Sequence, residues 1–258
     1  MSDLKGKSLI VTGGASGIGE SASILAARAG ARVTIADMQE AAGERLAAKI
    51  RGEGGEAQFI RTDVSNEQQV KAMVAAAVSA YGRLDCAFNN AGVTAYAYTT
   101  GHPVLFADMP LSEFRRVLDI NLVGVFLCMK YEIPAMLEAG GGSIVNTSSC
   151  SGLVATPGTP DYTASKHGVI GLTKVAALDY ATQNIRVNAV LPGVIRTPMV
   201  DLAASGNPDV VRSIAESMPI KRLGQPHEIA EAALWLLSDA ASLVTGHSML
   251  VDGGYTMV

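Results

Sequence analysis

The sequence predicts an α/β protein of the Rossmann-like, doubly wound type, with a parallel sheet of about seven strands. Short apolar runs alternate with helical stretches along the whole chain. The apolar runs are continuous rather than alternating, as expected of parallel strands that helices cover on both faces. A glycine-rich turn follows the first of these runs, which is typical of the same architecture. No repeat or low-complexity linker divides the 258 residues, so we expect one domain, 1–258.

The first half of the chain begins with the apolar run SLIVTG and continues in regular alternation. Expected are strand 8–13, helix 17–30 with small residues and a glycine stop, strand 31–37 (ARVTIAD), helix 38–50 rich in Ala, Glu and Lys, strand 56–64 (EAQFIRTDV), helix 66–81, and strand 84–92 (LDCAFNNAG). Each strand passes into a polar or glycine-containing turn, which marks its end.

The second half contains two irregular stretches, 94–110 and 197–223, which lack a clear period. Around them we expect helix 111–139 with Pro134 near its end, strand 142–149 (GSIVNTSS), helix 161–182, strand 185–193 (IRVNAVLPG), helix 226–237 and strand 247–254 (HSMLVDGG). Both irregular stretches follow strands. Ligands of such sheets sit beyond the carboxyl ends of the strands, so both stretches are candidate walls of a substrate site.

Composition excludes several functional classes. The net charge is −4 and no Lys/Arg run is present, which argues against nucleic-acid binding. The three cysteines have no metal-like spacing, so we expect reduced thiols and no metal site. The first residues do not form a signal-peptide pattern, and no stretch suggests a bilayer span. We therefore expect a soluble, cytoplasmic protein without a membrane or nucleic-acid partner.

The turn TGGASGIG places Gly13, Gly17 and Gly19 between the first strand and the first helix, with Ser16 and Ile18 among them. Glycines permit a tight turn and the close approach of a ligand, and the free amides of a helix start suit a pyrophosphate. An ordinary glycine-rich turn is the alternative. The strand before it, the helix after it and an acid further along favour a dinucleotide site.

That acid is Asp37, at the end of the second strand, where a carboxylate can accept hydrogen bonds from a ribose diol. A carboxylate there repels the extra phosphate of NADP, and no Lys or Arg stands at positions 15, 16 or 38, so we expect NAD. A solvated strand-end acid is the alternative. Asp63 and Val64 close the third strand, where Asp63 faces the adenine amino group or, alternatively, caps the next turn.

The stretch YTASK places Tyr162 four residues before Lys166, which puts both on one face if the segment is helical. A nearby ammonium favours the phenolate, and a phenol so activated exchanges protons. The same spacing occurs by chance on many amphipathic helices, so the pair alone decides nothing.

Six motifs occur in a fixed order: TGGASGIG, NNAG (89–92), NLVG (121–124), Ser149, YTASK and LPGVIRTP (191–198). In this order they resemble the short-chain dehydrogenase/reductase family over essentially the full length. Ser149 stands thirteen positions before Tyr162, which matches the serine–tyrosine spacing of that family. By itself Ser149 would be one of four neighbouring strand-end hydroxyls.

The resemblance implies a role for each matching residue. Tyr162 is the expected acid/base, Lys166 lowers its pKa and binds the nicotinamide ribose, and Ser149 holds the substrate oxygen. Asn121 is expected to bend its helix and seat a water in a proton relay. Expected to line the cofactor are Asn89, Asn90, Ala91, Gly92, Pro192, Gly193 and Thr197, together with Tyr162 and Lys166.

The expected function is hydride transfer between NAD(H) and a secondary alcohol or ketone. An isomerase or lyase on the same fold, and a non-catalytic nucleotide sensor, are the alternatives. Apolar residues in both irregular stretches suggest a mostly apolar pocket, which leaves sugars, steroids and small cyclic ketones open. His102 is expected at the surface or pocket wall, and Cys150 either touches substrate or is an inert buried thiol. The resemblance also implies a homotetramer with helices 111–139 and 161–182 at one interface.

Overall fold

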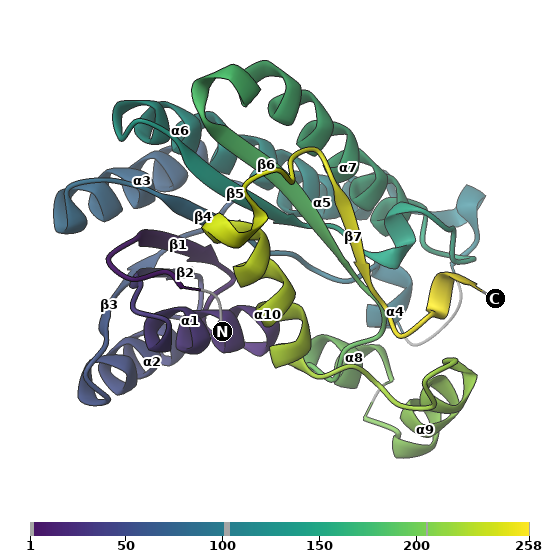
Figure 1. Cartoon of the computed structure of the whole chain (residues 1–258). Helices are drawn as coiled ribbons and strands as arrows, with labels where there is room; N and C mark the ends of the chain where they lie inside the picture. The colour runs from purple at the N-terminus through teal and green to yellow at the C-terminus, as the bar shows by residue number, and fades with distance from the viewer. Residues whose placement is uncertain (1–2, 101–103, 205, 258) are drawn as a thin grey trace.

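The computed structural model describes residues 3–100, 104–204 and 206–257 and contains a seven-stranded, fully parallel sheet (Figure 1). The strands lie in the order β3-β2-β1-β4-β5-β6-β7. Their bounds are β1 Ser8–Thr12, β2 Arg32–Asp37, β3 Glu56–Arg61, β4 Cys86–Asn89, β5 Gly142–Thr147, β6 Ile185–Pro192 and β7 Ser248–Val251. The predicted doubly wound fold and the strand count are confirmed.

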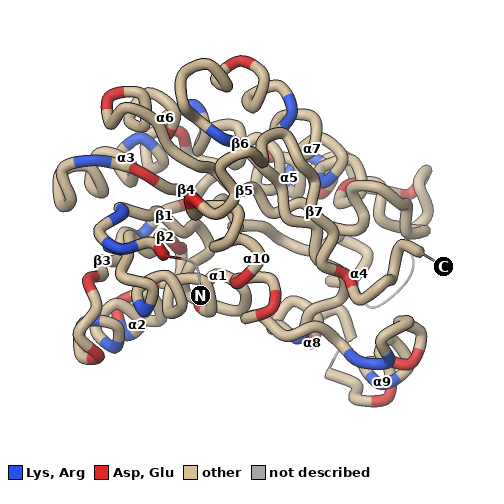
Figure 2. Tube along the Cα trace, in the orientation of Figure 1, with Lys and Arg blue, Asp and Glu red and all other residues tan. Residues whose placement is uncertain are grey.

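Helices cover both faces of the sheet and enclose two separate cores (Figure 1). On one face lie α1 (Gly17–Arg28), α2 (Glu40–Gly52) and α10 (Pro226–Leu237). On the other lie α3 (Glu67–Tyr81), α5 (Leu111–Leu118), α6 (Gly124–Glu138) and α7 (Pro160–Tyr180). Figure 2 shows charges of both signs scattered along these helices, whereas β1, β4, β5 and β7 carry none. The strands are therefore free to fill both cores with apolar side chains.

The strand order reverses between β1 and β4, which pair in parallel with Thr12 beside Asn89. The chain leaves β1 toward β2 on one side and β4 toward β5 on the other, so the loops after β1 and β4 diverge. A crevice opens at such a switch point, beyond the carboxyl ends of the strands.

Both stretches predicted to be irregular contain short helices. The first holds α4 (Tyr96–Thr100) and a 3₁₀ turn, Phe106–Asp108; the second holds α8 (Pro198–Ala203) and α9 (Pro208–Ser217). Proline occupies the first position of α8 and of α9, where its missing N–H costs nothing. α4 and α8 are too short for a clear 3.6-residue period. α9 does have one, because Val210, Val211 and Ile214 recur at helical spacing, so this helix was recognisable in the sequence and the expectation of an irregular stretch was wrong there.

The predicted helix 111–139 is one helical rod with a π-helical turn, η2 (Asp119–Val123), between α5 and α6. The expectation that no stretch could span a bilayer needs correction. Leu111–Glu138 is 28 residues long and has a mean hydropathy of 1.4. By length and composition alone it is therefore long and apolar enough to cross a membrane. Half of its apolar window is buried inside the protein, as in a core helix.

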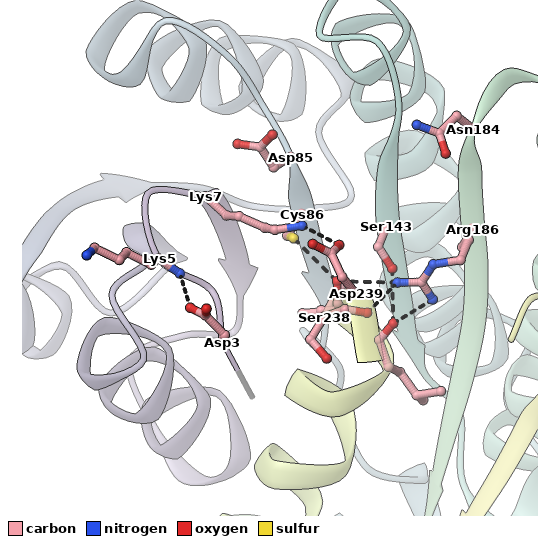
Figure 3. A network of polar contacts seen from close by, with 12 residues as sticks. Asp3, Lys5, Lys7, Asp85, Cys86, Ser143, Asn184, Arg186, Ser238 and Asp239 are labelled. Atoms are coloured by element: carbon pink, nitrogen blue, oxygen red, sulfur yellow. Dashed lines mark hydrogen bonds and ion pairs between the residues drawn. The ribbon is translucent and has the colours of Figure 1, made fainter. Parts of the chain in front are cut away.

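The opposite, amino-terminal edge of the sheet is closed by a polar network (Figure 3). The Arg186 guanidinium donates to the carbonyls of Leu236 and Ser238 and so caps the end of α10. A hollow of about 370 Å³ lies here, but its charges are paired: Lys7 with Asp239 and Arg83 with Asp85. None of the site residues expected from sequence lines it.

Candidate active site

The glycine-rich turn lies against the end of β4. Gly13 and Gly17 have positive φ angles of 61° and 54°. A Cβ on Gly13 would stand 2.8 Å from Ala91 Cα, and one on Gly19 would stand 2.0 Å from the Gly13 carbonyl oxygen. Side chains at Gly13 and Gly19 would therefore push the turn away from the switch point.

The crevice at the switch point holds a groove of about 340 Å³ that brings most of the expected cofactor residues together. It is lined by Gly13, Ser16, Gly17, Ile18, Asp37, Asp63, Val64, Ala91, Gly92 and Thr197. No Lys or Arg is among the lining residues that the structure describes. Gly19 lies outside the groove lining, beneath the turn.

Asp37 joins the glycine turn to the start of α2. Its Oδ2 accepts a hydrogen bond from the Ala15 amide at 3.1 Å, and its Oδ1 accepts from the Gln39 amide at 3.0 Å. The carboxylate is thus held in place and is 9% exposed. Asp63 instead accepts from the amide and hydroxyl of Ser65, so it caps the next turn while also lining the groove.

A smaller cavity of about 110 Å³ adjoins the groove and shares Ile18, Gly92 and Thr197 with it. Its other lining residues include Ser149, Tyr162, Lys166, Pro192 and Gly193. Ser149 follows β5 in an extended conformation, and its hydroxyl accepts from the Ser151 amide at 3.1 Å. The structure therefore gathers the serine, the tyrosine and the lysine from β5 and α7 into one cavity.

The helix α7 places Lys166 one turn after Tyr162, as the spacing predicts. Lys166 Nζ lies 5.5 Å from the centre of the Tyr162 ring and donates a hydrogen bond to the Thr147 carbonyl at 2.9 Å. The Lys166 backbone carbonyl accepts from the Ser148 hydroxyl at 2.8 Å, which ties α7 to the end of β5.

Burial, rather than Lys166, dominates the proton affinity of the phenol. Loss of solvent raises the pKa of Tyr162 to about 12, although the Ser149 hydroxyl opposes the rise. Burial also lowers the pKa of Lys166 to about 8, because the ammonium is desolvated. Lys166 is not among the groups that shift the pKa of Tyr162 in the protein alone, so the expected lowering by Lys166 stays a prediction. With a pKa of about 8 the lysine keeps most of its positive charge near neutrality.

Asn121 lies in the π-helical turn and is fully buried. Its side-chain nitrogen donates to the Val93 carbonyl at 2.9 Å, and its side-chain oxygen accepts from the Val93 amide at 2.8 Å. The side chain thus pairs with both backbone polar groups of Val93. A Cβ on Gly92 would stand 3.1 Å from Asn121 Oδ1 and 3.7 Å from Lys166 Nζ. Asn121 and Lys166 thus flank Gly92, and the relay role of Asn121 remains a prediction.

Asn89 does not line the groove, which corrects the expectation for this residue. Its side chain is buried and donates to Glu132 Oε2 and Asn146 Oδ1, both at 3.0 Å. The next residue, Asn90, lines the groove and donates to the Thr12 carbonyl at 3.2 Å. β4 ends at Asn89, whose side chain turns toward Glu132 on α6, and Asn90 follows the strand with its side chain against the glycine turn. Only Asn90 of the two therefore faces the groove.

Cys150 lies beside Ser149, with 3.7 Å between its sulfur and the serine hydroxyl oxygen. Burial raises the pKa of the Cys150 thiol and so disfavours the reactive thiolate. Of the two expectations for Cys150, this favours the inert buried thiol. All three cysteines are buried and free. His102 lies outside the described residues.

Comparison with known proteins identifies the family. A protein-family model described as "Enoyl-(Acyl carrier protein) reductase" matches residues 13–256. A 2,5-dichloro-2,5-cyclohexadiene-1,4-diol dehydrogenase of Sphingobium indicum is 48% identical over 259 residues, covering 100% of both chains. A cyclohexanol dehydrogenase of Acinetobacter sp. is 43% identical over 97% of this chain and 95% of its own. The crystal structure of a short-chain type dehydrogenase/reductase from Mycobacterium marinum superimposes with a TM-score of 0.91 at 37% identity, covering 99% and 98% of the two chains.

The chain belongs to the short-chain dehydrogenase/reductase family. It is an oxidoreductase of the class that acts on CH–OH groups, and members of its family use nicotinamide cofactors. The isomerase, lyase and nucleotide-sensor alternatives are therefore set aside. The groove at the switch point and the adjoining Ser149–Tyr162–Lys166 cavity are the parts of this short-chain dehydrogenase/reductase that fit such a reaction.

Proposed function

We propose that this short-chain dehydrogenase/reductase oxidises secondary alcohols on six-membered rings with NAD and reduces the corresponding ketones with NADH. One observation carries the proposal: Ser149, Tyr162 and Lys166 line a single cavity that opens onto the glycine-lined groove. The alcohol is thereby held next to the place where the nicotinamide end of the cofactor fits.

In the proposed reaction Tyr162 Oη takes the hydroxyl proton of the alcohol, and Ser149 holds the same oxygen. The bound nicotinamide supplies the hydride acceptor and, when oxidised, a positive charge. With a pKa of about 12 the phenol is protonated near neutrality, so oxidation needs added positive charge near it. Lys166 contributes through its ammonium, and Asn121 beside Gly92 holds the water of the relay. Reduction runs the same proton transfers backwards.

The proposed cofactor is NAD rather than NADP. Asp37 is positioned to bind the two adenosine ribose hydroxyls, and its negative charge opposes a phosphate there. The groove residues named above are the proposed cofactor contacts, with Asp63 and Val64 beside the adenine and Thr197 at the nicotinamide end. Pro192 and Gly193 form the wall of the nicotinamide pocket.

The proposed substrate class follows from the relatives and from the cavity walls. Two relatives are named for hydroxyl groups on six-membered rings. Val93, Met199 and Val200 add an apolar lining to the cavity, which suits a ring carbon skeleton. The family model is described by an enoyl reductase, so an enoyl thioester serves as the comparison substrate.

We further propose a cytoplasmic homotetramer. Three free, buried cysteines fit a reducing compartment. Apolar side chains are exposed on helices of one layer: Leu111 60% and Phe126 48% on α5 and α6, and Val175 58% and Leu178 81% on α7. Contact between copies of the chain would remove this surface from water.

The test is a panel of cyclohexanols, acyclic secondary alcohols and an enoyl thioester, each assayed with both cofactors by the absorbance of the reduced nicotinamide. We expect turnover of ring alcohols with NAD. Turnover of the enoyl thioester and of no ring alcohol would overturn the proposed substrate class.

Tyr162→Phe tests the assigned base. Removing the hydroxyl should lower kcat by at least about 10²–10⁴-fold, the usual contribution of general acid–base catalysis. NADH binding, measured by fluorescence titration, should change little. Tyr180→Phe, at the other end of α7, is the matched control and should retain activity. A Tyr162→Phe enzyme with normal kcat would refute the role.

A further inference from the structure

Asp161 immediately precedes Tyr162 and is fully buried. Its Oδ1 accepts a hydrogen bond from the Tyr162 amide at 2.8 Å. Its Oδ2 accepts from the amide of Tyr96 at 2.9 Å. Tyr96 is the first residue of α4, 65 positions earlier in the chain. One carboxylate therefore connects the start of α4 to the residue that carries the proposed catalytic phenol.

The chemistry of the site explains why an aspartate stands there. A buried carboxylate is costly unless hydrogen bonds and positive potential compensate it. No Lys or Arg in the described part of the chain forms an ion pair with Asp161, but it lies in the first turn of α7, where the helix dipole favours negative charge. Both carboxylate oxygens accept an N–H. An asparagine has only one acceptor oxygen and could satisfy only one of the two amides.

The helix α4 does not line the smaller cavity itself but packs against α8, whose Met199 and Val200 do. It is anchored by the buried residues Ala95 and Ala97, and it contacts α8, which follows Thr197. Burial raises the pKa of Tyr98 on α4, and the neighbouring groups that act on its hydroxyl include Tyr255 and Cys150. Cys150 directly follows Ser149 in the chain. Burial is the main cause of the raised pKa of Tyr162, and Tyr98 adds to it, so the two phenols are within electrostatic reach of each other.

We infer that Asp161 is a positioning residue that holds α4 against the start of α7. Through the contact of α4 with α8, it sets the distance between the substrate wall formed by Met199 and Val200 and the phenol of Tyr162. This role rests on the proposed function, because the wall matters only if a ring alcohol binds beside Tyr162. Asp161 lines neither the groove nor the smaller cavity. Its carboxylate is bonded to α4 and α7 and not to the glycine turn, which is held by Asp37. Loss of Asp161 should therefore act on alcohol binding, through α4 and α8, and leave NADH binding intact.

The kinetic test compares Asp161→Ala and Asp161→Asn with Asp179→Asn, which makes the same charge change at an exposed site on α7. We expect KM for the ring alcohol to rise by about tenfold or more in Asp161→Ala and less in Asp161→Asn, which keeps one acceptor. The fall in kcat should be smaller than the rise in KM. The Kd of NADH should stay within about twofold of wild type, and Asp179→Asn should behave as wild type. Equal losses of alcohol and NADH affinity, or a fall in kcat alone, would overturn the inference.

A double-mutant cycle tests whether the effect passes through α4. If it does, Tyr98→Phe should alter KM less in the Asp161→Asn background than in wild type, because α4 is already displaced. Strict additivity would contradict the coupling.

Hydrogen exchange gives a readout that does not depend on activity. In Asp161→Asn the amides of residues 94–100 should exchange about tenfold faster than in wild type, while those of α10 stay unchanged. Unchanged exchange in α4 of Asp161→Asn would refute the structural link between Asp161 and α4. If the wild-type enzyme turns over no ring alcohol, yet exchange in α4 is faster in Asp161→Asn, the proposed substrate is wrong and the link between Asp161 and α4 is still supported.

Discussion

At the scale of single residues, the chemistry of the site depends on the protonation states of Tyr162 and Lys166. Tyr162 and Lys166 both lose solvent, so each is driven toward its neutral form, the phenol by a pKa of about 12 and the amine by one of about 8. Their pairing on one helical face was evident from the sequence, but the extent of their burial was not. A Tyr162 phenol that is neutral in the protein alone, and that nearby positive charge helps to deprotonate, suits the proposed reaction. In that reaction the oxidised nicotinamide carries a positive charge and the reduced one does not.

Asp37→Ala should relax the preference for NADH over NADPH. The wild-type carboxylate repels a phosphate on the ribose, and a repulsion of about 1.4 kcal/mol already amounts to a tenfold preference. We therefore expect the ratio of kcat/KM for the two cofactors to shift toward NADPH by at least about tenfold. Glu40→Gln, which removes an equal charge outside the groove, should leave the ratio unchanged. A wild-type enzyme that prefers NADPH would overturn the assignment of NAD.

At the scale of elements, two helices carry polar groups into the core. The π-helical turn between α5 and α6 brings Asn121 to Val93, and α6 brings Glu132 to Asn89 at the end of β4. Glu132 is fully buried, and its Oε1 has no hydrogen-bond partner in the described part of the chain. Burial raises the pKa of Glu132 to about 7, although the bond from Asn89 opposes the rise.

The titration of Glu132 should make stability depend on pH. Its carboxyl keeps its proton in the folded state up to about pH 7, whereas the unfolded chain releases the proton near 4.5. The unfolded state therefore binds fewer protons in this window, and the free energy of unfolding should fall as pH rises from about 4.5 to about 7. Below that window the contribution is fully present, and above it the contribution is lost.

Glu132→Gln should remove this dependence, because the amide stays neutral at every pH. At about pH 8 the variant should be more stable than wild type by roughly 1–3 kcal/mol, since one pKa unit corresponds to 1.36 kcal/mol. Urea denaturation at several pH values measures the difference. Glu138→Gln, exposed on the same helix, is the matched control and should follow wild type. A wild-type stability that rises across this window would contradict the assignment.

At the scale of the whole molecule, the parallel sheet decides where chemistry occurs. The reversal of strand order between β1 and β4 opens the groove, and the end of β5 delivers Ser149 beside it. The opposite edge, although it holds a hollow of similar size, is closed by paired charges and by the Arg186 cap on α10 (Figure 3).

Leu178→Lys should weaken the proposed tetramer. Leu178 is 81% exposed on α7, and burying a lysine charge between copies of the chain is unfavourable. Analytical ultracentrifugation should show smaller species at concentrations where the wild type is tetrameric, with the circular dichroism spectrum unchanged. Val210→Lys, at a 40% exposed site on α9, should leave the assembly intact. A wild-type chain that sediments as a monomer would contradict the proposal.

The sequence by itself determined the sheet, the order of its elements and the identity of most groove residues. Continuous apolar runs, glycine turns and the ordered motifs are local or pairwise signals, and they do not depend on how distant segments pack. They failed where length was insufficient, as for α4 and α8, whereas the amphipathic period of α9 was present in the sequence. They also could not decide which of Asn89 and Asn90 faces the groove, because that depends on how the chain turns where β4 ends.

Only the tertiary structure decided the electrostatics and the long-range ties. The pKa directions of Tyr162, Lys166 and Glu132 follow from how much water the packed layers exclude, and no local pattern records that. The hydrogen bond that the Tyr96 amide donates to Asp161 joins residues that lie 65 positions apart. Such contacts exist only once the sheet has brought separate loops to one edge, which is why they could not be predicted from the chain alone.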